Sequence, residues 1–422
     1  MPYFYHHEQG AYSRVILLYL LVSIVLVSGF FSAPFPSEYG LPEAFIGVLL
    51  VCLSLFSLSF VGKRISMRAA LLFLPFLYLL FVPSCVSVLR LNSLSDYLRD
   101  IVPLLFIFLP AILLPLIERQ ANIRGVLVLC VAMFVSGIVI SLRYIYGVGA
   151  VLGEYGRGLV ISESAYYTLF AYDSLIAFVC IVGVATSLIL TLTGKGHERL
   201  LGLLIGGVSL IAFIPPIGIV QRVPLVMIFF SLMIVVIMIG RERPKIYGYV
   251  ACLAVGMLVF FGDILLGSVL LIVEKTTIHG ANGKIIELIA VFNKLFEVPS
   301  NVLFGIGWGG LYENPVLHGE ARYTHSLLTF IVLKTGVIGL LFFLIYLFWF
   351  LKRLFLVARM SVKYNIRLLS VSLYICTMFT ISLFQPVYKT LNFGISMVLL
   401  LFVYYGMVHH IKTLAVRMSD KN

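Results

Sequence analysis

Charge is scarce in this chain of 422 residues. Only 11% of the residues are Asp, Glu, Lys or Arg, whereas a soluble domain carries roughly 25%. This shortage excludes an ordinary soluble globular protein. The mean hydropathy is +1.10, and apolar runs of nearly 20 residues recur along the whole sequence, which predicts membrane-spanning helices. The runs are continuous rather than alternating, which argues against a β-barrel.

Three further features are missing. No polar segment is long enough for a second domain, so we expect a single transmembrane domain over residues 1–422. The six cysteines fall inside apolar runs, and no two are close enough in sequence to indicate a metal site. We interpret them as buried small hydrophobic residues. The first apolar run, Val15 to Phe31, has no convincing small-residue cleavage site, which predicts an uncleaved span.

The apolar runs predict an all-α, polytopic membrane protein with about twelve transmembrane helices. Their approximate limits are 15–31, 42–61, 69–89, 101–117, 125–142, 172–193, 200–217, 223–240, 246–266, 326–351, 368–386 and 391–408. Alternate loops then hold 19 and 10 of the Lys and Arg residues, with Lys334 inside a span. The acidic residues sort the opposite way, 5 against 13.

The side that is rich in Lys and Arg also holds both termini. By the positive-inside rule this side is cytoplasmic, so the other side is expected to face outward. The net charge of +12 is therefore a signal of membrane topology. We exclude nucleic acid as a partner on this ground.

The long loops fall on the outer side, at 143–171 and 267–325. Loops of this length are often functional. In the second loop, residues 283–296 place apolar side chains at helical spacing, which predicts a helix along the membrane surface. Pro299 should end this helix, and a glycine-rich turn follows at 304–310.

Charge inside the spans is sparse. Apart from Lys334 the span centres carry none, which weighs against an ion-coupled transporter. Lys334 lies nine residues after His325, so a helix would turn it to the opposite face and roughly 13 Å deeper. We expect Lys334 to pair with a carbonyl or a carboxylate elsewhere in the bundle. Any chemistry should lie at the outer ends of the spans.

Two outer residues are the candidate catalytic groups. His325 stands at the mouth of the tenth span, and histidine exchanges protons near neutrality. The alternative is an interfacial histidine that caps the helix. Arg222 lies in a short, proline-flanked outer loop, and the planar guanidinium binds phosphate oxygens. The alternative for Arg222 is a snorkelling anchor.

Further residues are candidates for substrate binding. Arg322 and Tyr323 lie in the same turn as His325. Lys284 and Glu287 lie one helical turn apart, so they can share a face or pair with each other. The alternative for this pair is a solvated amphipathic helix.

Other outer charges are arginines that the positive-inside rule disfavours, namely Arg90, Arg99, Arg143 and Arg157. Of these, Arg143 and Arg157 lie in the first long loop and are counted as candidates for substrate binding. Asp96 and Asp100 have no third ligand nearby, so we expect a solvated helical turn there. The sequence predicts no metal site and no cofactor.

The outer loop and the tenth span resemble the bacterial O-antigen polymerase and O-antigen ligase superfamily. The resemblance rests on a glycine-rich turn, a His-Ser pair and a G-x-x-G step, together with the twelve-span plan and an outer-edge arginine, Arg222. The residues of the motif are Gly305, Gly307, Gly309, His325, Ser326, Gly336 and Gly339. The motif covers about 60 residues and is degenerate.

The resemblance implies a metal-independent, GT-C-like glycosyltransferase of the bacterial inner membrane, with its active site facing the periplasm. Its substrate would be an oligosaccharide on undecaprenyl pyrophosphate within membrane lipid. Arg222 would hold the pyrophosphate and His325 would serve the acceptor hydroxyl. Lys284 stands where the family often has a second arginine, and Arg322 is the alternative for that role. Many members have glutamate where this chain has Lys334.

We favour a polysaccharide polymerase, which moves a growing chain from undecaprenyl pyrophosphate onto the next lipid-linked repeat unit. The loop departs from the arginine pattern of the ligases, which decides this preference. The alternative is an O-antigen ligase, which moves the glycan onto lipid A-core. A flippase or exporter of the same glycan is a third reading, for which charge lining a path across the membrane would be expected. We leave open whether a chain-length regulator is a further partner.

Overall fold

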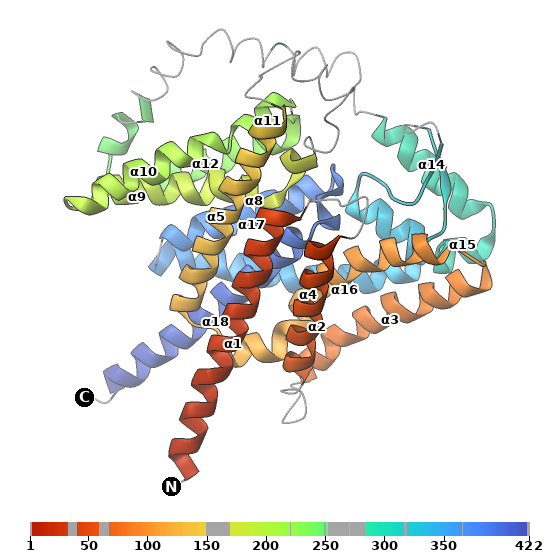
Figure 1. Ribbon diagram of the computed structural model, residues 1–422, viewed down its shortest axis with the longest axis horizontal. Helices are drawn as coiled ribbons and strands as arrows, with labels where there is room; N and C mark the ends of the chain where they lie inside the picture. The colour runs from red at the N-terminus through yellow and green to blue at the C-terminus, as the bar shows by residue number, and fades with distance from the viewer. Residues whose placement is uncertain are drawn as a thin grey trace.

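The computed structural model describes residues 2–32, 40–58, 67–148, 169–219, 221–248, 250–251, 270, 283–315, 319–364 and 366–419. Over these ranges the chain is almost entirely helical (Figure 1), with one pair of short strands. Eight of the described helices are long and apolar enough to cross a membrane, and three shorter apolar helices accompany them. The chain is an all-α polytopic membrane protein, as the sequence predicts.

The helices follow the apolar runs of the sequence. In the first half of the chain they are α1 (Pro2–Phe31), α2 (Leu41–Leu58), α3 (Met67–Leu89), α4 (Leu94–Gln120), α5 (Ile123–Val148), the 3-10 helix η2 (Leu169–Tyr172), α8 (Ser174–Phe178), the π-helical η3 (Val179–Gly183), α9 (Val184–Thr193) and α10 (His197–Ile211). In the second half they are α11 (Ile214–Gly218), α12 (Arg222–Glu242), α14 (Lys284–Phe296), α15 (Pro299–Phe304), α16 (Leu327–Tyr364), α17 (Ile366–Ser382), η4 (Pro386–Lys389) and α18 (Leu391–Ser419).

The predicted spans agree with these helices wherever the structure describes them. Every predicted span except 246–266 coincides with a described helix or a continuous series of helices. Most of 246–266 lies outside the described residues, so the number twelve stays a prediction. The prediction that the cysteines are buried was wrong in part, because Cys180 is buried but Cys52, Cys85 and Cys376 are exposed. An apolar run in a membrane protein faces lipid as well as its neighbours, so hydropathy alone does not predict burial.

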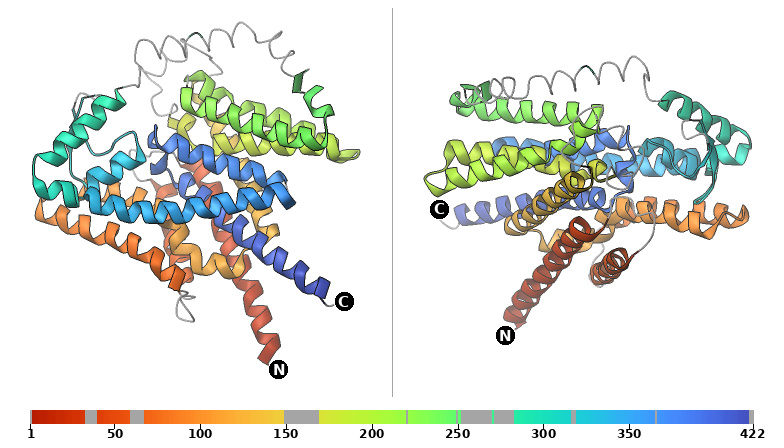
Figure 2. Two further views of the ribbon diagram at one scale, coloured as in Figure 1. Left: turned by 180° about the vertical axis from the view of Figure 1, so that it is seen from behind. Right: turned by 45° about the horizontal axis from the view of Figure 1, so that its top comes forward.

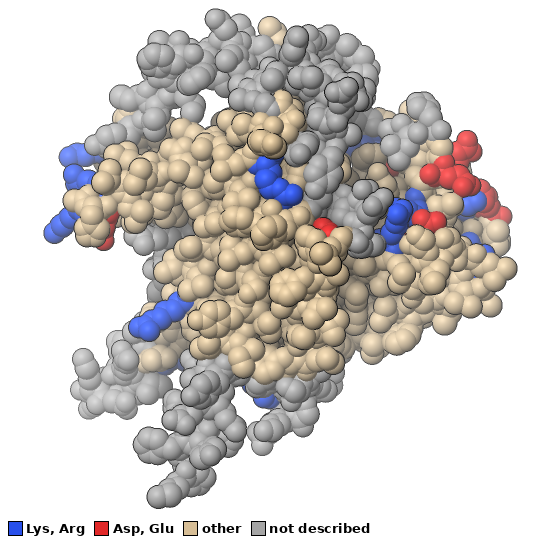
Figure 3. All heavy atoms as spheres, in the orientation of Figure 1, with Lys and Arg blue, Asp and Glu red and all other residues tan. Residues whose placement is uncertain are grey.

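The core forms around α4 and α18, which pack against each other and are the most buried of the long helices. Around them α1 packs on α5, α9 on α10, α12 on α17, and α16 on both α3 and α17. Figures 1 and 2 show both termini on the side of the bundle away from α14 and α15. On the face seen in Figure 3, charged side chains are few over the helical surface and gather mainly at its left and right ends.

The second long loop builds a small layer on one end of the bundle. The helix predicted over 283–296 is confirmed as α14, which buries Glu287, Val291 and Leu295 at intervals of four residues. The helix ends at Phe296, before Pro299, and Pro299 occupies the first turn of the next helix, α15, where a proline loses no helical hydrogen bond. Two strands of three residues follow, β1 (Tyr312–Asn314) and β2 (Gly319–Ala321), paired antiparallel. They are too short for a sequence pattern to reveal.

The glycine-rich turn is fixed against a break in α16. Gly336 has φ of 66° and ψ of −169°, a conformation that is essentially restricted to glycine. A Cβ at Gly336 would overlap the backbone carbonyl of Leu303. The backbone N–H of Ile306 donates to the carbonyl of Leu333 at 2.9 Å. Gly336 therefore allows α16 to lie directly against α15 and the glycine-rich turn.

Candidate functional site

A cavity of about 1640 Å³ lies where α14, the 322–326 loop and the 383–392 segment meet the ends of several helices. Its charged and histidine lining residues are Glu43, Arg99, Asp173, Arg222, Lys284, Glu287, Arg322, His325 and Lys389. Each of them belongs to a segment that the charge sorting assigns to the outer side. Cations outnumber carboxylates five to three in this set, so the cavity favours an anionic ligand.

His325 is held by a buried carboxylate. Its ring Nδ1 lies 3.0 Å from Oε1 of Glu287, and its backbone N–H donates to Oε2 at 3.1 Å. The Glu287 side chain is about 4% exposed and also accepts from Tyr312 and Asn314. An ionised carboxylate only accepts hydrogen bonds, so Nδ1 carries the proton in this contact. In the neutral form of the ring, this contact leaves Nε2 as the hydrogen-bond acceptor.

The carboxylate of Glu287 stays ionised. Burial raises the pKa of Glu287, but the hydrogen bonds and charge of His325 and the hydroxyl of Tyr312 outweigh burial and hold it below its usual range. Burial raises the pKa of Tyr312 most, and the charge and hydrogen bond of Glu287 raise it further. The network therefore places a fixed negative charge behind the ring of His325, where it stabilises the ring after protonation.

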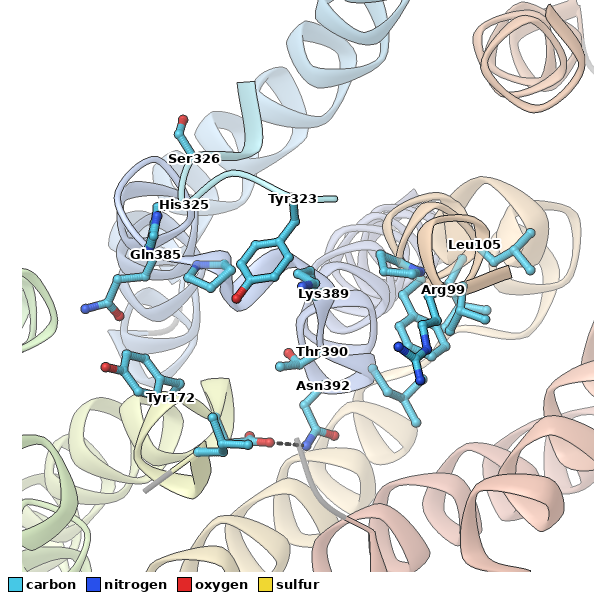
Figure 4. Close-up of a pocket in the computed structure, with 18 of the residues that line it drawn as sticks. Arg99, Leu105, Tyr172, Tyr323, His325, Ser326, Gln385, Lys389, Thr390 and Asn392 are labelled. Carbon is cyan, nitrogen blue, oxygen red and sulfur yellow. Dashed lines mark hydrogen bonds between the residues drawn. The ribbon is translucent and has the colours of Figure 1, made fainter. Parts of the chain in front are cut away.

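A cationic cluster lies beside the histidine. Arg322 pairs with Asp96 through its Nε at 3.1 Å, and Nζ of Lys389 lies 3.3 Å from the ring centroid of Tyr323. Burial, together with the charges of Arg322 and Lys334, lowers the pKa of Lys389 to about 7, although Asp100 opposes the shift. Figure 4 shows Tyr323 and Lys389 side by side at the open space that His325 borders.

A second pair of cations lies on another wall of the cavity. Arg222 begins α12, and Lys284 begins α14. Burial lowers the pKa of Lys284, and the charge of Arg222 lowers it further, so the two cations share one electrostatic environment. The structure therefore brings Arg222, which precedes His325 by 103 positions, into the cavity of His325.

The remaining wall of the cavity is apolar. It consists of residues of α2 and α4, among them Ile46, Leu50, Val51, Leu55, Val102, Leu105, Phe106 and Leu109. On α2, Val51 and Leu55 are exposed at 58% and 61%. The cavity thus joins a charged region to an apolar one along two membrane helices, as an amphipathic lipid would require.

Two predicted binding residues do not reach this cavity or cannot be placed. Arg143 is absent from the lining and donates to the carbonyls of Gly29 and Ser32 at 2.9 and 2.7 Å. Its guanidinium also lies over the ring of Phe170, at 4.3 Å. In the structure Arg143 thus ties α5 to the end of α1. Arg157 lies outside the described residues.

Other expectations for this region also need correction. Asp100 is 2% exposed and pairs with Lys334 at 2.6 Å, so it does not belong to a solvated turn. The expected partner of Lys334 is thereby identified, and the ammonium group also donates to the carbonyl of Gly310 at 2.6 Å. The aromatic residues Trp308 and Tyr312 of the outer loop are fully buried. Trp308 donates to the carbonyl of Leu79.

Sequence reasoning missed several charged members of the cavity, namely Glu43, Asp173, Glu287 and Lys389. Lys389 was counted among the ten outer Lys and Arg residues, but no pattern distinguished it from the others. Glu287 was considered only as a partner of Lys284. Its position three residues after Lys284 on an apolar-spaced helix could have indicated that it faces inward with Val291 and Leu295.

A scan of protein-family models and a search of curated proteins each found no match to this chain. Among the described residues, no group of three or more His, Cys, Asp or Glu side chains is arranged to hold a metal ion. The function is therefore argued from the cavity itself.

Proposed function

We propose that this chain is a GT-C-like membrane glycosyltransferase that polymerises polysaccharide from lipid-linked repeat units. It would move a growing glycan from undecaprenyl pyrophosphate onto the next lipid-linked repeat unit. One observation carries the proposal: a carboxylate-held histidine and five cations line the same cavity, which continues as an apolar wall along α2 and α4. In this reading the bundle has twelve spans in the bacterial inner membrane, with both termini in the cytoplasm and the cavity facing the periplasm.

The reaction assigns a role to each part of the cavity. The acceptor hydroxyl oxygen attacks C1 of the sugar that joins the growing glycan to pyrophosphate, and the bond between C1 and the phosphate oxygen breaks. Nε2 of His325 accepts the hydroxyl proton, as a general base. Undecaprenyl pyrophosphate leaves with the bonding electrons, and its growing negative charge is stabilised by fixed cations.

Arg222 and Lys284 are the proposed holders of the pyrophosphate. Arg222 can present two parallel N–H donors to phosphate oxygens, whereas Lys284 acts as a point charge. Arg322 already pairs with Asp96, so part of its charge is neutralised before a phosphate arrives. We therefore rank Lys284 above Arg322 as the second phosphate ligand, and assign Tyr323 and Lys389 to the region between phosphate and His325.

The apolar wall accounts for the lipid. An undecaprenyl chain consists only of hydrocarbon, and its transfer from lipid into a polar cavity would be unfavourable. Along α2 and α4 the chain would stay in an apolar environment while its pyrophosphate reached the cations. The same wall gives a flippase less support, because the charged lining residues all come from outer segments rather than from a path across the membrane.

The test is genetic and chemical. Deletion of the gene should leave single repeat units on lipid A-core when surface glycans are separated on a gel. Polymer that accumulates on the carrier lipid, with no glycan on lipid A-core, would instead identify the alternative, an O-antigen ligase. Unchanged glycans would refute both.

The site assignment is tested in the same strain. His325→Ala and Arg222→Ala should each reproduce the deletion at a normal level of protein. Lys294→Ala is the matched control, because Lys294 also lies on α14 but pairs with Glu297 and lies outside the cavity lining. Full activity of both cavity variants would show that the chemistry lies elsewhere.

A further inference from the structure

A group of uncharged polar side chains lines the cavity near His325, and the proposed reaction leaves it unused. We call it the amide wall and define it as Gln221, Gln385 and Asn392. Gln221 precedes α12, Gln385 precedes η4, and Asn392 lies in the first turn of α18, yet all line the same cavity. In Figure 4, Gln385 and Asn392 border the open space that His325 also borders.

Each amide of this wall has a buried atom without a partner. Nε2 of Gln221, Oε1 of Gln385 and Oδ1 of Asn392 are buried without a hydrogen-bond partner among the residues that the structure describes. Gln221 is 4% exposed and Asn392 is 2% exposed. Buried amide atoms are normally paired. Three unpaired atoms on one cavity wall therefore indicate a partner that is bound there in use.

A neighbouring carboxylate fixes Asn392, one member of the wall. Asp173 accepts from the backbone N–H of Leu175 at 2.8 Å and from Nδ2 of Asn392 at 2.9 Å, the bond drawn in Figure 4. This bond holds the nitrogen of the Asn392 amide and leaves its Oδ1 without a partner. The terminal torsions of Gln221 and Gln385 are soft, so their unpaired ends can turn toward the cavity without breaking a bond that those atoms make.

The chemistry of the wall selects the class of ligand. It offers a donor and two acceptors, and the ring of Tyr172 lines the cavity beside it. A phosphate only accepts hydrogen bonds from cations and donors, and a hydrocarbon chain makes none. A sugar hydroxyl both donates and accepts, so a sugar ring can satisfy the donor and the acceptors together.

We propose that the amide wall binds the hydroxyl groups of the sugar that lies next to His325, with Tyr172 beside the ring. The inference rests on the proposed function and deepens it, because it separates recognition of the sugar from recognition of pyrophosphate. A bound water is the competing occupant. A hollow of about 20 Å³ lies against Gln221 and Gln385, which is enough for one water molecule.

The experiment compares two lipids on the purified full-length protein in nanodiscs. One is the lipid-linked repeat unit extracted from the deletion strain, and the other is undecaprenyl pyrophosphate without sugar. Gln221→Met and Gln385→Met remove an amide and keep the length of the side chain. Gln221 makes no side-chain cap to α12, so its replacement removes no helix cap.

Each methionine variant should bind the repeat-unit lipid about tenfold more weakly, the usual effect of one lost hydrogen bond to a ligand. Binding of undecaprenyl pyrophosphate should not change. Lys284→Ala should weaken the binding of both lipids, which shows that the assay detects the phosphate contact. If a methionine variant does not fold, Gln221→Asn, which withdraws the amide by one methylene, carries the same prediction.

The other outcomes refute the inference in distinguishable ways. Wild-type binding of both lipids by the methionine variants means that the amides hold water only. If the methionine variants weaken the binding of both lipids equally, Gln221 and Gln385 have a structural role. If wild type binds undecaprenyl pyrophosphate as tightly as the repeat-unit lipid, the sugar site fails and the phosphate site stands. If wild type binds neither lipid, the proposed function fails and the sugar site fails with it.

Discussion

Glu287→Gln removes the charge behind His325 and keeps the size of the side chain. Oε1 of Glu287 lies 3.0 Å from the ring Nδ1 of His325, 3.0 Å from the hydroxyl of Tyr312 and 2.9 Å from Nδ2 of Asn314. Oε2 accepts the backbone N–H of His325 at 3.1 Å. A glutamine has one oxygen and one NH₂ group, so its nitrogen must face at least one of these donors.

The size of the effect follows from these contacts. A buried donor that loses its acceptor costs about 1–3 kcal/mol, so Glu287→Gln should lower the free energy of unfolding by about that amount. Catalysis should suffer more than stability. A positioned general base contributes about 10²–10⁴-fold, and without the carboxylate the ring of His325 no longer prefers the Nδ1–H form. We expect a rate loss of about 10²-fold, smaller than that of His325→Ala.

Single-turnover transfer between lipid-linked repeat units, measured in nanodiscs, checks the rate. Binding of undecaprenyl pyrophosphate should stay unchanged in Glu287→Gln, because the variant removes a carboxylate and none of the cations. Stability supplies an independent check. Since the pKa of Glu287 is lowered in the fold, its contribution is lost only as the pH falls through that lowered value, and the stability difference should narrow there. A variant with the wild-type rate would refute the role of Glu287.

Three further outcomes are expected. Lys334→Met should lower the free energy of unfolding, measured by thermal unfolding, by about 3–5 kcal/mol, because it leaves Asp100 charged and buried. Adding Asp100→Asn should restore most of this loss. No rescue by the second substitution would contradict the pairing. Burial lowers the pKa of Lys389 to about 7, so from pH 7 to 8 wild type should lose roughly fivefold in affinity for undecaprenyl pyrophosphate, whereas a pH profile of Lys389→Arg should be flat. Gly336→Ala should cost at least about 1–3 kcal/mol of strain, besides its overlap with Leu303; an unchanged melting temperature would contradict the tight contact.

Much of the fold follows from local pattern. Apolar run length predicted the spans, and the helical spacing of the apolar residues in 283–296 predicted α14, because both signals depend only on neighbouring residues. The break at Gly336 could not be predicted in the same way. A glycine inside an apolar run is compatible with a continuous helix, and only the approach of α15 to α16 requires its positive φ.

The site was predicted less completely than the fold. His325, Arg222, Lys284, Arg322 and Tyr323 were chosen as outer residues, and the structure places all five in one cavity. Arg143 was chosen on the same ground and instead binds backbone carbonyls. An outer position is a property of the sequence, whereas a place in the cavity depends on which way each helix end turns.

The sequence by itself determined that this chain is a helical membrane protein, and it predicts that the long polar loops share one side. Hydropathy and charge carry these inferences because the membrane selects for them residue by residue. Only the tertiary structure decided that Glu287 contacts His325, that Lys389 lines the same cavity as the other cations, and that Asp100 pairs with Lys334. Those contacts join residues between 38 and 234 positions apart, and such separations are closed by packing that no local pattern encodes.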